Sequence, residues 1–154
     1  MPSAQLLLGS EMRHAGNPAG GALAALSLGA AGEPIAPARQ LWPPVHGAAS
    51  SAASPAVFAG DPACTQAPRA ASFSPHGIAN AAPAADGSVA VAAVGHGERE
   101  AIELFRLRGV GEGASLEWTG CVPLPPDAVG NDVWLDASGG IWTTNYQPAM
   151  TGLS

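Results

Sequence analysis

Lysine is absent from this sequence of 154 residues, and its six basic residues, all arginine, are outnumbered by twelve acidic ones. The formal charge of −6 leaves no clustered cationic surface, which nucleic-acid binding requires for the release of counterions. Long apolar runs are also missing, because the stretch 20–32 is rich in Ala and Gly and is well short of the roughly 20 residues that span a bilayer. We therefore expect neither a nucleic-acid partner nor a membrane span. The leucines at 6–8 are too few for a signal-peptide core, and the compartment stays open.

The motifs of the common nucleophilic and zinc enzymes are lacking as well. The sequence contains no Gly-x-Ser-x-Gly, no His-Glu-x-x-His and no Cys-x-x-Cys. Gly109-x-Gly111-x-Gly113 lacks the full spacing of a phosphate-binding loop and precedes an expected strand, so it predicts a hairpin loop.

Cysteine occurs only at positions 64 and 121, a separation that matches no metal-binding or redox motif. Two interpretations stay open. Cys64 and Cys121 are either two buried thiols that behave as small apolar side chains, or a disulfide that ties the long loop before Phe73 to a sheet edge. The disulfide would add roughly 3–4 kcal/mol of stability and would place the protein in an oxidising compartment.

Glycine (20) and proline (15) are abundant, while 47% of the residues are hydrophobic and gather in short runs. This combination predicts an all-β fold with many turns. We expect strands at 5–10, 22–28, 35–41, 76–79, 88–95, 101–107, 116–124, 132–136 and 141–144. The segment 42–72 is rich in Ala, Ser and Pro, and we expect a long, mobile excursion there, since it has little to bury.

An internal repeat organises these strands. The segments 75–78 and 130–133 lie 55 positions apart, and each leads into a hairpin whose second strand ends in a polar side chain, His96 or Asn145. A repeat of short strands at this length is typical of a β-propeller, in which each repeat is a four-stranded blade. The chain would cover about 2.8 repeats, whereas propellers need about four or more blades to close. We expect a partial first blade at 1–41, the excursion at 42–72, a complete blade at 73–126 and the truncated start of another at 127–154.

His76 and His96 are the candidate catalytic residues. His76 begins one expected inner strand and His96 ends its antiparallel neighbour, so both side chains are expected at the same end of the sheet. An imidazole with a pKa near 6.5 is suited to act as a general base toward water at neutral pH. His14 and His46 have no such context, and we expect them at the surface.

Five motifs together resemble the paraoxonase/arylesterase family. They are Phe73-Ser74-Pro75-His76-Gly77-Ile78, Val94-Gly95-His96, Ile102-Glu103-Leu104-Phe105, Asn131-Asp132-Val133 and Thr144-Asn145. They are also similar to the wider calcium-dependent propeller superfamily, with its gluconolactonase and strictosidine-synthase-like groups. The resemblance covers roughly residues 73–146. It implies a six-bladed propeller with calcium in the central channel, and an enzyme that hydrolyses lactones, aryl esters or related esters.

Carried over residue by residue, the resemblance gives each candidate a role. His76 and His96 match the family's water-activating pair, and Asn131 matches a ligand of the catalytic calcium. Asp132 matches a ligand of a second, structural calcium, to which the backbone of Ile78 would contribute. Calcium would polarise the ester carbonyl and stabilise the oxyanion. The sequence departs from the family at Gly95, where Asn is usual, and the other calcium ligands would lie outside this chain.

We therefore expect a fragment of a calcium-dependent esterase or lactonase that acts on a small-molecule substrate. Two alternatives stay open. One is a non-catalytic propeller that binds a ligand or a partner. The other is an inactive truncated product, whose open strand edges would promote self-association.

Overall fold

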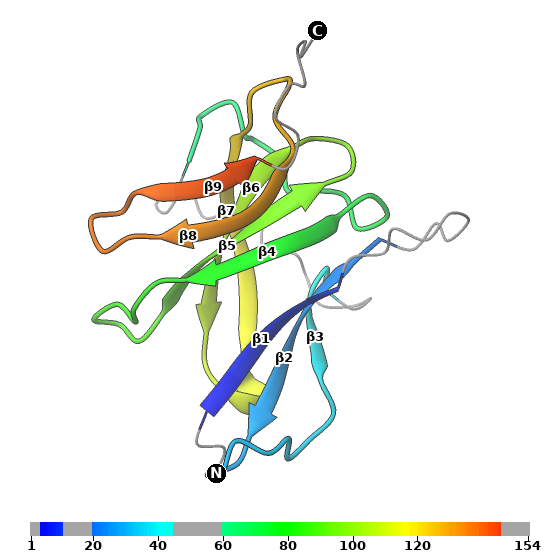
Figure 1. Cartoon of the computed structure of the whole chain (residues 1–154). Coiled ribbons are helices and arrows are strands. Elements are labelled where there is room, and N and C mark those ends of the chain that lie inside the picture. Colours follow the sequence, from blue (N-terminus) through cyan, green and yellow to red (C-terminus); the bar gives the residue numbers. More distant parts are fainter. Residues whose placement is uncertain (1–3, 11–19, 45–59, 146–154) are drawn as a thin grey trace, which may run out of the picture.

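The computed structural model describes residues 4–10, 20–44 and 60–145, and this part of the chain is all-β, as predicted (Figure 1). It forms three antiparallel sheets, none of them closed into a barrel. The N-terminal sheet has the order β1-β2-β3, the central sheet β4-β5-β6-β7, and the C-terminal hairpin β8-β9. The strands are β1 (Ala4–Ser10), β2 (Ala22–Leu28), β3 (Arg39–Trp42), β4 (Ser74–Asn80), β5 (Val89–His96), β6 (Ala101–Arg108), β7 (Ser115–Pro123), β8 (Gly130–Leu135) and β9 (Ile141–Asn145). Within these ranges no helix is long and apolar enough to cross a membrane.

The third strand differs from its prediction at 35–41. β3 begins only at Arg39, and before it a single bridge joins Leu28 to Pro34. Pro34 and Pro37 cannot donate to a ladder, so regular pairing begins after the second proline. The predicted hairpin loop at 109–113 is confirmed, with a short 3-10 turn at Gly111–Gly113.

The 55-residue repeat is visible in the pairing of the strands. In the central sheet, Pro75 pairs with Gly95 and Ile78 with Ala93, so a bulge at 76–77 lies between them. In the C-terminal hairpin, Gly130 pairs with Asn145 and Val133 with Thr143, which places an identical bulge at 131–132. His76 and Asn131 therefore occupy equivalent positions. A bulge bends its strand and re-aims the side chain that it carries, and bulges are over-represented beside active sites.

The central sheet is covered on both faces. One face packs against the N-terminal sheet through a core that includes Leu23, Trp42, Phe73, Phe105 and Trp118. Edge contacts of Phe105 with Trp42 and Phe73, at centroid distances of 5.4 and 6.2 Å, hold this core together. The opposite face packs against Val133 of the C-terminal hairpin through a smaller cluster of Ala92, Val94, Ile102 and Leu104. The three sheets thus form a stack, and the candidate site lies where the beginning of β4 meets the end of β5.

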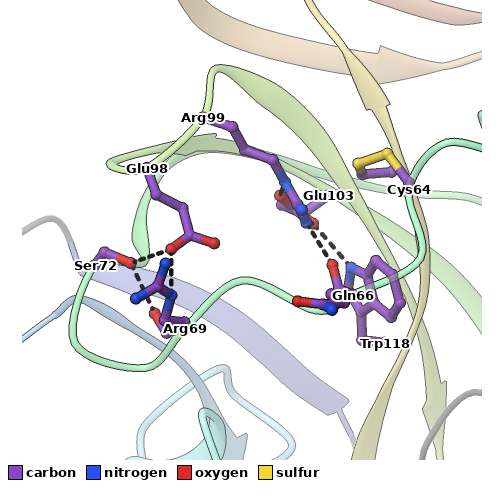
Figure 2. A network of polar contacts seen from close by, with 9 residues as sticks. Cys64, Gln66, Arg69, Ser72, Glu98, Arg99, Glu103 and Trp118 are labelled. Carbon is purple, nitrogen blue, oxygen red and sulfur yellow. Dashed lines mark hydrogen bonds and ion pairs between the residues drawn. A yellow bond between two sulfur atoms is a disulfide. The ribbon is translucent and has the colours of Figure 1, made fainter.

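The segment 60–73, here called the anchored segment, is attached to the central sheet, contrary to the expectation of a mobile excursion. Cys64 forms a disulfide with Cys121 of β7, so the interpretation as two buried thiols was wrong (Figure 2). Arg99 donates to the backbone carbonyl of Gln66, and Arg69 pairs with Glu98 at 2.8 Å. The average composition of the segment predicted little burial. It did not reveal the attachment, because the attachment depends on only a few side chains. Residues 45–59 lie outside the described part of the chain.

Candidate functional site

The two candidate histidines lie side by side. His76 stands in the β4 bulge and His96 is the last residue of β5, and their ring centroids are 5.6 Å apart with a tilt of 55°. His76 is exposed, whereas His96 is only 7% exposed. The bulge brings the rings together because it adds a residue to β4 opposite β5, which shifts His76 toward the end of its neighbour.

A carboxylate that the sequence analysis did not single out holds the buried ring. Nδ1 of His96 lies 2.8 and 2.9 Å from the two carboxylate oxygens of Glu100. An ionised carboxylate only accepts hydrogen bonds, so Nδ1 is the donor in this contact, and in the corresponding neutral tautomer Nε2 is an acceptor. Nε2 is buried and has no hydrogen-bond partner among the described residues. With Nδ1 as the donor to Glu100, Nε2 is the ring nitrogen that can accept a proton or a ligand.

The loop that carries Glu100 is fixed from two sides. Gly97 has a φ of +118°, and a Cβ there would collide with the carbonyl oxygen of Ser72 in the anchored segment. Glu98 accepts a hydrogen bond from Ser72 (Figure 2). The carbonyl of Glu100 accepts from the amide of Leu124. Because Glu100 follows His96 by four residues, a short rigid loop is needed for the two side chains to meet.

The candidate calcium ligands lie beside the histidine strand. A Cβ at Gly77 would lie 2.5 Å from Cα of Asp132 and 2.7 Å from the carbonyl oxygen of Asn131, so β4 and β8 are in backbone contact here. Asp132 is exposed, and its Oδ1 accepts from the amide of Val133 at 2.9 Å. Ile78 follows in β4, where it pairs with Ala93. The structure thus places the part of β4 that holds His76 and Ile78 beside Asn131 and Asp132 of β8.

These residues match calcium in donor type but not in number. Calcium takes six to eight oxygen ligands, and Asn131, Asp132 and the backbone of Ile78 supply three. No group of three or more His, Cys, Asp or Glu side chains within residues 20–44 and 60–145 is arranged to hold a metal ion. The described residues do not complete a calcium site, and calcium stays a prediction of the resemblance.

Glu100 is the residue of the candidate site that the sequence analysis missed. A carboxylate four positions after a strand-ending histidine is nevertheless a signal that can be read from sequence. The side chains of His96 and Glu100 meet only because the chain turns back through a tight loop between them. That loop requires Gly97, whose φ is positive. His14 and His46 lie outside the described residues.

Family models, curated proteins and solved structures were each compared with this chain, and no match was found in any of the three comparisons. The assignment of this site therefore rests on the geometry of its own residues.

Proposed function

We propose that this chain carries the water-activating site of a hydrolase for esters or lactones. One observation carries the proposal: His96 is buried, its Nδ1 is held by Glu100, its Nε2 has no partner among the described residues, and its ring lies beside that of His76. A base oriented by a carboxylate is the arrangement by which a neutral imidazole removes a proton from water.

In the proposed mechanism, a water molecule donates a hydrogen bond to Nε2 of His96. As its oxygen attacks the ester carbonyl, the proton moves to Nε2, and the carboxylate of Glu100 stabilises the imidazolium that forms. The tetrahedral intermediate then releases the alcohol or opens the lactone ring, and the leaving oxygen takes a proton from the histidine pair. His76 is exposed and lies next to His96, so it is placed to pass this proton between the site and solvent.

The resemblance assigns the polarisation of the carbonyl to calcium. The described residues supply only part of a calcium shell, so the proposal rests on the histidines, and calcium is tested separately below.

The same proposal takes the three sheets as successive blades of a β-propeller. Two features support this architecture: the bulge that recurs at 76–77 and 131–132, and the face-to-face stacking of the sheets. In a propeller the innermost strands line the channel, where β4 and β8 would present His76 and Asn131.

A non-catalytic binding module is the second candidate function. The observation that favours it is Gly95, which stands where the resembled family has Asn. A Cβ at Gly95 would lie 2.9 Å from Cγ of the buried Glu103, so this chain has no room for that side chain. A binding module would keep the architecture without turnover.

Hydrolysis of phenyl acetate and of a simple lactone by the purified chain decides between the two. We expect His96→Gln to lower the rate by roughly 10²- to 10⁴-fold, the usual contribution of a general base. Glu112→Gln, in the loop at the far end of β6, is the matched control and leaves the rate unchanged. A His96→Gln variant that folds and retains its rate contradicts the proposal, and no turnover by the unmodified chain favours the binding module. Addition of EDTA or calcium tests the metal separately. Activity that survives EDTA excludes a requirement for calcium and is still consistent with catalysis by the histidines.

A further inference from the structure

The contacts of His96 are also those of a metal-binding histidine. Histidines that bind a metal through one nitrogen almost always donate the other N–H to a carboxylate, a backbone carbonyl or water. Here Nδ1 of His96 is held by Glu100, and the buried Nε2 has no partner among the described residues. Burial of the ring shields this nitrogen from bulk water, so hydrogen bonds to bulk water do not compete with a ligand that reaches it.

The second histidine lies at a suitable distance. With metal–nitrogen bonds of 2.0–2.1 Å, two imidazoles on one tetrahedral ion have their ring centroids about 5 Å apart. The centroids of His76 and His96 are 5.6 Å apart. Because the ring of His76 is exposed, it can turn at little cost and present a nitrogen to an ion bound at His96.

We propose that His76 and His96 together bind one divalent transition-metal ion of the zinc type, with Glu100 as the carboxylate that orients His96. Two imidazole nitrogens select such ions over calcium, which takes oxygen ligands. Water fills the remaining coordination positions. This site is distinct from the calcium ligands that the resemblance implies. Its occupation removes Nε2 from catalysis, so on the proposed function the ion acts as an inhibitor.

The test is calorimetric titration of zinc chloride into the purified, metal-free chain without reductant. The disulfide between Cys64 and Cys121 must stay intact, since released thiols would bind zinc themselves. We expect one ion per chain, no binding at this site in His96→Gln or His76→Gln, and 10- to 100-fold weaker binding in Glu100→Gln, the usual cost of losing such a partner. A tenfold excess of calcium leaves the zinc affinity unchanged.

A control variant and a folding check make the test decisive. His14→Gln with His46→Gln removes the other two imidazoles of the chain and is expected to leave zinc binding unchanged. His96 is buried, so thermal melts accompany its variant, and the exposed His76 gives the same test without disturbing the core. Zinc binding that survives His76→Gln, or that disappears with His14 and His46, overturns the proposal. The heat of binding is measured without substrate, so an inactive chain that binds zinc refutes only the proposed hydrolase.

Discussion

Glu103 shows how a single buried charge can organise its surroundings. Its carboxylate is 1% exposed and accepts from Arg99 at 2.8 and 2.9 Å and from the indole nitrogen of Trp118 at 2.8 Å (Figure 2). Arg99 also holds the carbonyl of Gln66, so the same ion pair attaches the anchored segment. A buried carboxylate is tolerated only with such partners, because an unpaired charge in the interior is very costly.

Removal of Arg99 is expected to destabilise the protein strongly. Arg99→Ala leaves Glu103 buried with one donor, and we expect a loss of about 3 kcal/mol in the free energy of unfolding. Arg108→Ala is the matched control, because its pair with Asp86, at 3.4 Å between exposed side chains, is screened by solvent and contributes little. Urea unfolding of both variants measures the difference, and equal losses contradict this account of Glu103.

Gly77 is expected to be essential for the contact between β4 and β8. A methyl group there would meet backbone atoms of Asn131 and Asp132, which cannot move aside as a side chain tip can. We expect Gly77→Ala to separate the two strands and to lower stability by about 1–3 kcal/mol. Gly113→Ala is the control, since nothing lies within 4 Å of a Cβ at that position. Hydrogen exchange at the amides of β8 reports the separation, and unchanged exchange in Gly77→Ala would show that the close packing is not required.

At the scale of elements, the C-terminal hairpin depends on Asp136 in its turn. The carboxylate accepts from the hydroxyl and amide of Ser138, the amide of Gly140 and the indole nitrogen of Trp142. These hydrogen bonds, that of the Ser138 hydroxyl first, hold the pKa of Asp136 well below its ordinary value of 3.8. Trp142 pairs across the hairpin with Trp134, and both are 61% exposed.

This turn is expected to loosen only in strong acid. A folded-state pKa below the unfolded one contributes stability that is fully present above pH 3.8 and is lost as the pH falls through the lower folded value. We expect Asp136→Ala to speed hydrogen exchange at the amide of Gly140 at neutral pH, while the unmodified hairpin stays protected at pH 4. Loss of protection in the unmodified chain near pH 5 contradicts the lowered pKa.

The anchored segment is expected to depend on its disulfide. The bond links positions 57 apart, and loop closure of that length corresponds to about 4 kcal/mol. Cys64→Ser with Cys121→Ser is therefore expected to lower the unfolding free energy by about that amount and to expose the segment to proteolysis. Limited proteolysis of both forms checks this. Equal resistance would mean that Arg69 and Arg99 hold the segment by themselves.

At the scale of the whole molecule, strands were easier to predict than attachments. Alternating apolar runs and glycine turns marked nearly all strands, and the offset from Pro75 to Gly130 marked the repeat, although the bulge within it was not predicted. The start of β3 was missed because two prolines delay its pairing. The disulfide and Glu100 could not be settled in advance, since each depends on how distant or looped segments meet in space.

The central sheet, covered on both faces, is expected to be the most protected part of the stack. The outer edges of the N-terminal sheet and the C-terminal hairpin have no further strand paired to them among the described residues. Open strand edges promote association. We expect the apparent mass in light scattering to rise with concentration, and a mass that stays monomeric at every concentration contradicts this expectation.

Nitrogen NMR of the His96 ring tests the central claim most directly, because the proposed chemistry requires a free Nε2 held in place by Glu100. The account predicts that the neutral ring carries its proton on Nδ1, and that Glu100→Ala changes this tautomer preference. A ring that carries its proton on Nε2 would contradict the account, since that nitrogen could then accept neither a proton from water nor a metal ion.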